Sequence, residues 1–386
     1  MNRSITLVFS ISLMAVIGIV SITPALPLIA NELNISKEKI GILVSVFTLP
    51  GIILTPIFGI ISDKLGRRFI LLPSIFILGF FSILSFFARD FYLLTIFRFL
   101  SGIGAASLGA MNITLIGDMF DNVKREKILG YNNSVLNLGT TVFPFLAGIL
   151  ANIHWSLVFA LPSLAILIFI WLLTSFKDIA PAPKISEKYF RNFLNLLKNK
   201  VLIKIFIVNL LTYIILFGSL WTYLPLLMSQ RFNAEPFFIG LTLSSMSFTT
   251  SIFSIFFGHL VKKISYIKLF SLSFILYSIA LFLVTVVSEW YYLFIATVLF
   301  GIGHGLNLPN IQAFIIRLAP DTHRSGIIFL NRTISQVGQT AGPLISAGIL
   351  FLFSNTNVSI NAVFYFSVIL GILLAVFSQF ISTKNN

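Results

Sequence analysis

Two residues that could do chemistry stand deep inside long apolar stretches of the sequence. Arg98 lies in the stretch 92–117 and His304 in the stretch 291–316. An arginine at the centre of a membrane-spanning helix costs roughly 2.5–3.5 kcal/mol to insert, so it is rarely without a role. A histidine can gain or lose a proton near neutral pH. We interpret Arg98 as a fixed cation that binds anionic groups of the substrate or tunes a proton site, and His304 as a group that carries the proton. Purely structural roles are the alternative for both.

Polar side chains also recur at helical spacing in two other apolar stretches. One set is Arg332, Gln336, Gln339 and Pro343, and the other is Asn133, Asn137, Thr140 and Pro144. This spacing puts each set on one helix face. An amide facing lipid would lack hydrogen-bond partners, so both faces must meet protein or a water-filled cavity. Asn137, Arg332 and Gln336 are therefore candidates for substrate or proton coupling, with hydrogen bonding between helices as the alternative.

The residues that enzymatic, metal or nucleotide chemistry needs are absent or scattered. The sequence has no Cys, and its four His show no metal-ligand spacing. Its 12 Asp and Glu fall in predicted loops or at predicted helix ends. No Walker-type phosphate loop is present, so ATP is not the expected energy source. We expect no enzyme activity, no metal and no cofactor.

The elements that must position these residues follow from composition. Of 386 residues, 57% are hydrophobic and 10% charged, with a mean hydropathy of +1.00. A soluble domain carries about 25% charged residues, so lipid must be the solvent. Twelve stretches are apolar and long enough to cross about 30 Å of hydrocarbon, namely 6–29, 40–61, 69–88, 92–117, 128–151, 155–176, 202–228, 237–260, 267–288, 291–316, 327–352 and 360–382. We predict an all-α membrane protein with twelve transmembrane helices, the first of them an uncleaved N-terminal helix.

Charge sets the domain organisation and the expected topology. The longest polar interval separates an N-terminal half, 1–176, from a C-terminal half, 201–386, and 177–200 is the linker. Of the 26 Lys and Arg, 21 fall on or near one side if the N-terminus lies inside. The positive-inside rule then predicts a multi-pass protein of the cell (inner) membrane with a cytoplasmic linker and both termini cytoplasmic. A nucleic-acid partner is not needed to explain the net charge of +14.

The two predicted halves repeat. A shift of 199 residues places Gly41 on Gly240, Asn132 on Asn331 and Pro144 on Pro343, almost without gaps. Since each half has six predicted helices, both halves start on the same side of the membrane. The repeat is therefore parallel, about a pseudo-two-fold axis along the membrane normal, an arrangement that favours alternating access.

Local motifs resemble those of the major facilitator superfamily. The segment Gly59-Ile-Ile-Ser-Asp63-Lys-Leu-Gly66-Arg67-Arg68 resembles the loop signature G-x-L-x-D-r-x-G-R-r, with Ile61 in place of its Leu. Gly59 would permit close helix approach, Gly66 a tight turn, and Asp63 an ion pair with Arg67. The resemblance implies a gate in which Asp118, at the end of 92–117, is the acidic partner.

Further motifs resemble the twelve-span drug:proton antiporters of that superfamily. They are Ser21-Ile-Thr-Pro24-Ala-Leu-Pro27, Arg98-Phe-Leu-Ser-Gly102-Ile-Gly104, and the helix-packing motif at Gly139, Pro144, Gly338, Gly342 and Pro343. In the first copy of the packing motif Phe143 and Ala147 replace two glycines.

This resemblance implies a secondary transporter of small organic compounds, proton-coupled, acting as an exporter and functional as a monomer in the bilayer. An uptake permease or facilitator for an anionic or neutral metabolite is the alternative, favoured by Arg98 and Arg332 with no opposing acid. A membrane enzyme or receptor is a third hypothesis. Without a carboxylate inside a span, the proton must use His304, a peripheral acid such as Asp63 or Asp118, or the substrate itself.

Overall fold

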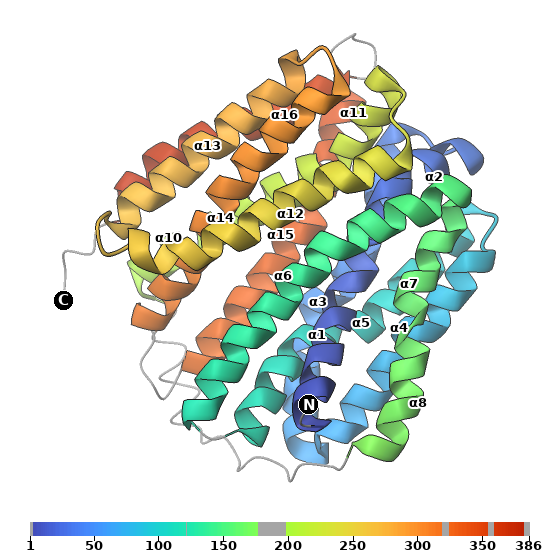
Figure 1. The fold of residues 1–386 in the computed structure, drawn as a ribbon, viewed down its shortest axis with the longest axis vertical. Helices are drawn as coiled ribbons and strands as arrows, with labels where there is room; N and C mark the ends of the chain where they lie inside the picture. Colours follow the sequence, from blue (N-terminus) through green and yellow to red (C-terminus); the bar gives the residue numbers. More distant parts are fainter. Residues whose placement is uncertain (1–2, 121, 177–197, 319–323, 354–358, 382–386) are drawn as a thin grey trace. The chain divides into compact units, whose positions relative to one another are not determined.

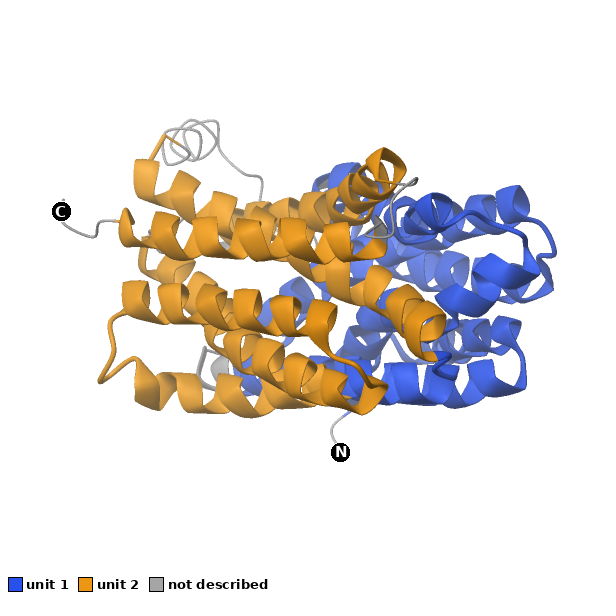
Figure 2. Cartoon of the chain, turned by 90° about the horizontal axis from the view of Figure 1, so that it is seen from above, with its two compact units in different colours: residues 1–183, 233–244 blue, residues 184–232, 245–386 orange. Residues whose placement is uncertain are grey.

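The computed structural model describes residues 3–120, 122–176, 198–318, 324–353 and 359–381 (Figure 1). All regular structure in these ranges is helical, which confirms the predicted fold class. Most of the predicted linker 177–200 lies outside the described residues. The helices group into two compact units, residues 1–183 with 233–244 and residues 184–232 with 245–386 (Figure 2). The predicted division into the halves 1–176 and 201–386 remains a prediction.

Unit 1 contains the helices of the first six predicted spans. They are α1 Arg3–Val20, η1 Thr23–Ala25, α2 Leu26–Glu32, α3 Lys37–Leu65, α4 Arg67–Phe87, α5 Phe91–Met119, α6 Asn122–Ile153, η2 Trp155–Phe159, α7 Ala160–Ser163 and α8 Ala165–Ser175. Helix α5 packs against α3, α4 and α1, while α6 packs against α1 and α8 against α4. The first turns of α12 also belong to this unit.

Unit 2 contains the helices of the remaining spans. They are α10 Lys200–Ile215, the π-helical η3 Leu216–Trp221, α11 Tyr223–Phe232, α12 Pro236–Leu260, α13 Tyr266–Val286, η4 Trp290–Tyr292, α14 Leu293–Leu318, α15 Arg324–Leu352 and α16 Ser359–Gln379. Helix α13 packs against α14 and α16, and α10 packs against α15. These pairs are the counterparts of those in unit 1.

Eleven of the helical segments in the described chain are long and apolar enough to cross a membrane. The remaining predicted span, 327–352, is also a helix, α15, of 29 residues. Its polar face, which includes Arg332, Gln336 and Gln339, lowers its hydropathy. Length and apolarity alone therefore do not identify α15 as a span, although its position in the fold is the predicted one.

The sequence repeat corresponds to repeated contacts within each unit. Thr55 Oγ1 donates to the carbonyl of Ala106 at 2.7 Å, and 199 residues later Ser254 Oγ donates to the carbonyl of Gly305 at 3.2 Å. Asn34 and Asn233, also 199 apart, have φ angles of 51° and 50°. Asparagine tolerates this left-handed conformation better than most residues, so the same turn follows α2 and α11.

Candidate functional site

A tight turn at Gly66 joins α3 to α4. The residue has φ 95° and ψ 155°, a conformation that favours glycine, and its N–H donates to the Ser62 carbonyl at 3.1 Å. The predicted tight turn is confirmed. Because α4 starts directly after Gly66, the turn places the side chain of Arg67 against the end of α5.

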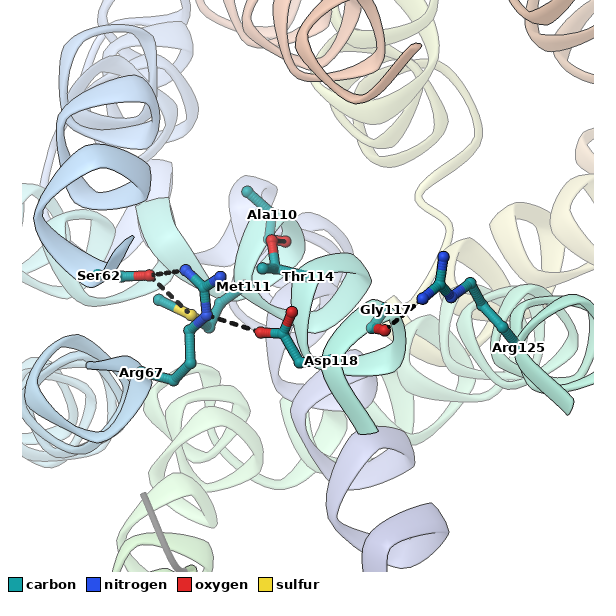
Figure 3. A network of polar contacts seen from close by, with 8 residues as sticks. All are labelled: Ser62, Arg67, Ala110, Met111, Thr114, Gly117, Asp118 and Arg125. Carbon is teal, nitrogen blue, oxygen red and sulfur yellow. Dashed lines mark hydrogen bonds and ion pairs between the residues drawn. The ribbon is translucent and has the colours of Figure 1, made fainter. Parts of the chain in front are cut away.

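Arg67 forms a partly buried ion pair with Asp118 of α5. Its Nε donates to Asp118 Oδ2 at 2.8 Å, and its Nη1 donates to Ser62 Oγ of α3 at 2.6 Å (Figure 3). The side chain of Arg67 is 5% exposed and that of Asp118 is 29% exposed. One guanidinium thus joins α3, α4 and α5 through charge-assisted hydrogen bonds. We name this cluster of Ser62, Arg67 and Asp118 the signature cluster.

Two other residues of the segment Gly59–Arg68, Asp63 and Gly59, were also given predicted contacts. The side chain of Asp63 lies outside the described part of the structure, so its predicted pairing with Arg67 stays a prediction. At Gly59, no heavy atom of the described chain lies within 4 Å of where a Cβ would stand. No described helix therefore approaches Gly59 closely in this structure, and the predicted close approach at this residue stays a prediction.

Two arginines near the signature cluster bind backbone carbonyls at helix ends. Arg68 donates to the carbonyls of Phe176 and Leu173, at 2.5 and 2.8 Å, at the end of α8. Arg125 of α6 donates to the Gly117 carbonyl of α5 at 2.6 Å (Figure 3). The last carbonyls of a helix carry partial negative charge and lack helical partners. Arg68 and Arg125 therefore stabilise the ends of α8 and α5 beside the cluster.

Arg98 is sealed inside unit 1. It is 2% exposed, its Nη1 donates to the Gly18 carbonyl of α1 at 2.8 Å, and its Nε donates to the Leu43 carbonyl of α3 at 3.4 Å. The guanidinium carbon lies 4.1 Å from the centroid of the Phe47 ring. Its Nη2 has no described hydrogen-bond partner. This geometry favours the structural alternative for Arg98, a tie between α5, α1 and α3.

His304 belongs to a buried polar network in unit 2. Its Nδ1 lies 2.5 Å from the Tyr277 hydroxyl of α13. Asn307, one turn further along α14, donates from Nδ2 to the same hydroxyl at 3.2 Å and to Thr212 Oγ1 of α10 at 2.9 Å. Sequence reasoning singled out His304 alone. The signal that could have found the other three residues is the repeat, because their counterparts in the first half are leucines.

Asparagines adjacent in sequence to the two polar sets take part in contacts between helices of one unit. In unit 1 Ser12 of α1 donates to Asn132 of α6, and in unit 2 Asn209 of α10 donates to Asn331 Oδ1 of α15 at 2.9 Å. These are asparagines that the 199-residue shift superposes. Asn137, Arg332 and Gln336 are half-buried. Gln339 is buried, and its Oε1 has no described partner.

The glycines of the packing motif stand where helices approach closely. A Cβ at Gly338 would lie 2.6 Å from the Leu210 carbonyl oxygen of α10, and one at Gly342 would lie 2.7 Å from that of Ile214. A Cβ at Gly139 would lie 3.1 Å from side-chain methyl groups of Leu13 and Val16 of α1, a looser approach than at Gly338 and Gly342. Pro144 and Pro343 follow within α6 and α15. The motif therefore packs the fifth span of each unit against the first.

No group of three or more His, Cys, Asp or Glu that could hold a metal ion occurs among the described residues. The polar sites above consist of arginine, amide, hydroxyl and imidazole groups on packed helices. Such groups can bind a small molecule or a proton within a membrane-embedded bundle. The architecture is that of a multi-pass membrane carrier.

The family model of the Major Facilitator Superfamily matches residues 8–233 and 205–385. The chain belongs to this superfamily of transporters, and it is not an enzyme. Similar proteins include the quinolone resistance protein NorA of Staphylococcus aureus strain MRSA252, 26% identical over 382 residues, with 97% of this chain and 95% of the relative covered. Multidrug resistance protein 1 of Bacillus subtilis strain 168 is 25% identical over 385 residues, covering 97% and 96%.

Solved structures share the fold. A bacterial homologue of the human lysosomal transporter Spinster superposes with a TM-score of 0.82 at 15% identity, covering 99% of this chain and 96% of that chain. A D-xylose-proton symporter superposes with a TM-score of 0.80 at 14% identity, covering 99% and 98%. At these identities the likeness concerns the fold alone.

Proposed function

We propose that this protein exports small organic compounds by alternating access, coupled to protons. The observation that carries the proposal is the full-length similarity to NorA and multidrug resistance protein 1, whose names state drug resistance, together with the family's transport fold. One proton moving down 100 mV releases about 2.3 kcal/mol. That is enough for a substrate gradient of roughly forty-fold at 1.4 kcal/mol per decade.

The signature cluster is the proposed cytoplasmic gate. Arg67 joins α3, α4 and α5 at one end of unit 1, and Asp63 is the proposed further acid of the gate. In the alternating-access cycle this cluster locks the outward-open state and must open for inward access. Both termini are cytoplasmic in this proposal, because the basic residues concentrate on the side of the Gly66 turn.

An uptake permease or facilitator for an anionic or neutral metabolite is the second candidate. It is supported by Arg332, a half-buried cation on the polar face of α15. Support from Arg98 is weaker, because the backbone carbonyls of Gly18 and Leu43 already bind its guanidinium. The two candidates differ in direction and in the charge of the substrate.

A flux screen in proteoliposomes tests the proposal. The full chain is reconstituted, and the probes are a quinolone, a lipophilic cationic dye and an organic anion under an imposed pH gradient. The exporter proposal predicts flux of the quinolone or the cationic dye that exceeds flux in protein-free liposomes. Flux of the organic anion alone would favour the second candidate, and no flux of any probe would contradict both.

A further inference from the structure

Four buried polar side chains of unit 2, contributed by three helices, form one hydrogen-bonded network. They are Thr212 of α10, Tyr277 of α13, and His304 and Asn307 of α14. Tyr277 is fully buried, its ring stacks on Phe300 at 4.0 Å between centroids, and His304 is 6% exposed. We call these four residues the unit 2 network.

Unit 1 contains an internal control for the unit 2 network. A shift of 199 residues places Thr212, Tyr277, His304 and Asn307 on Leu13, Leu78, Ala105 and Leu108. The surrounding frame is the same in both units. Gly102 packs on the Phe47 carbonyl and Gly104 on the Ser74 carbonyl, while Gly301 and Gly303 pack on the carbonyls of Met246 and Ser273. Since apolar residues fill this frame in unit 1, packing alone does not require the polar set in unit 2.

The hydrogen bonds of the unit 2 network allow one arrangement with a neutral His304. Asn307 Nδ2 donates to the Tyr277 hydroxyl, so the single hydroxyl hydrogen is free to point to His304 Nδ1. In this arrangement Nδ1 is the acceptor, and the hydrogen of the neutral imidazole is on Nε2. Asn307 Oδ1 is buried with no described partner. A buried amide oxygen without a partner is unfavourable, so this arrangement leaves one acceptor in reserve.

A second arrangement uses that reserve acceptor. If His304 gains a proton on Nδ1, Nδ1–H donates to the Tyr277 oxygen, and the Tyr277 hydroxyl hydrogen must turn to a new acceptor. Rotation of the Asn307 amide brings Oδ1 to the Tyr277 hydroxyl. Thr212 keeps a bond to the amide by turning its hydroxyl hydrogen to Oδ1 from the Val208 carbonyl, to which it donates at 2.8 Å in the first arrangement. One proton enters from water, one positive charge forms on the imidazole, and apart from the new N–H bond only hydrogen bonds change.

We infer that the unit 2 network is a proton-binding site, in which Tyr277 and Asn307 reverse their hydrogen bonds to hold the proton on His304. This inference rests on the proposed proton coupling and assigns its site. Tyr277 and Asn307 are positioning residues, and the proton resides on the imidazole. The site needs no carboxylate inside a span.

The other titratable and charged groups on the neighbouring helices lie toward helix ends or beside Tyr277. Tyr213 of α10 lies within electrostatic range of Tyr277. Lys268 is nine residues from Tyr277 on α13, about 13 Å along the axis. On α15, Arg332 is six residues, about 9 Å, from Gly338, which packs beside Tyr213. From α12, Thr250 and Ser254 bind the carbonyls of Gly301 and Gly305.

The test is nitrogen NMR of the full chain, labelled with ¹⁵N-histidine and reconstituted in lipid, from about pH 8 to about pH 4. The signals missing in His304→Gln belong to His304. We expect an unprotonated Nδ1 at the high end and protonation of both ring nitrogens on acidification. A hydrogen on Nδ1 at high pH, or a ring that stays neutral throughout, would overturn the inference.

Two variants distinguish the proposed proton-binding site from a network that only packs the helices. Tyr277→Phe and Asn307→Leu, which restore apolar character, should each reduce the proton affinity of His304 on the order of tenfold, since each removes a partner of the protonated form. If Tyr277 only held His304 neutral, Tyr277→Phe would increase that affinity. An increased or unchanged proton affinity of His304 in either variant contradicts the proposed proton-binding site. Tyr266→Phe, on the same helix α13, is the matched control and should leave that affinity unchanged. The NMR measurement needs no transported substrate, so its failure is distinct from failure of the flux screen.

Discussion

At the scale of single residues, Arg98 and His304 look alike in sequence and differ in their surroundings. Both are polar groups deep in apolar spans. Arg98 binds backbone carbonyls of two neighbouring helices, whereas His304 binds side chains that can reverse their hydrogen bonds. A backbone carbonyl only accepts, so the surroundings of Arg98 support one charge state. The side chains around His304 can hydrogen-bond both its neutral and its protonated form.

Arg98→Ala should lower the free energy of unfolding by on the order of 2–3 kcal/mol, because two hydrogen bonds from a charged group and the contact with Phe47 are lost. Arg98→Lys should recover less than half of this loss, since an ammonium lacks the planar fork. Thermal unfolding in detergent measures both. The control is Arg89→Ala, at an exposed loop position. An Arg98→Ala protein of wild-type stability with weakened substrate binding would instead make Arg98 a substrate ligand.

Sequence reasoning could place the polar residues on helices but not all of their partners. The carbonyls that bind Arg98 belong to Gly18 and Leu43, whose side chains give no polar signal. Matches between the halves do not reveal Tyr277 and Asn307, because the counterparts of both are leucines. Positions where one half is polar and the other is apolar, such as Leu78 and Tyr277, carry the information about the site.

At the scale of helices, the fold was predicted well because each span is a long apolar run bounded by charge or proline. The Gly66 turn and the packing glycines were also predicted, since close contacts and left-handed φ angles leave few residue choices. The surroundings of Gly59 could not be predicted, because a glycine that faces open space looks the same in sequence as one at a helix contact.

Gly338→Ala and Gly342→Ala should each destabilise the protein by about 1–3 kcal/mol, because the added methyl would overlap the carbonyl oxygens of α10. Gly348→Ala is the matched control on the same helix, because no other helix in the described ranges comes within 4 Å of its Cβ position. That variant should be neutral or more stable, by up to about 1 kcal/mol, since alanine favours helix. Thermal unfolding measures the three variants, and equal effects at all three would refute the packing role.

The ion pair between α4 and α5 predicts a measurable coupling. A double-mutant cycle of Arg67→Gln and Asp118→Asn should give about 1 kcal/mol or more, above most exposed pairs, because Arg67 is buried. Asp118→Asn should also reduce flux at least about tenfold if the cluster is a gate. Asp90→Asn, at the opposite end of α5 where the residue caps the helix, is the control. Wild-type flux in Asp118→Asn would remove the gate from the mechanism.

At the scale of the whole molecule, the charge distribution predicts the orientation in the membrane. The chain has no cysteine, so single cysteines can be introduced without a background signal. Lys263→Cys should react with a membrane-impermeant maleimide only from the cytoplasmic side, and Arg89→Cys only from the outside. The labelling pattern in intact cells and inverted vesicles checks this prediction. The reverse pattern would invert the proposed topology and the proposed side of the gate.

The most direct test of the central claim is the lumenal pH of proteoliposomes during substrate entry. Vesicles that contain the full chain and the pH indicator pyranine are mixed with the quinolone or cationic dye that shows flux, with no initial pH gradient. A proton-coupled exporter exchanges substrate for protons, so entry of substrate should make the lumen more alkaline, and His304→Gln should abolish the change. An unchanged lumenal pH during wild-type substrate entry would indicate facilitated diffusion, and acidification would indicate symport. Either result would contradict the proposed antiport.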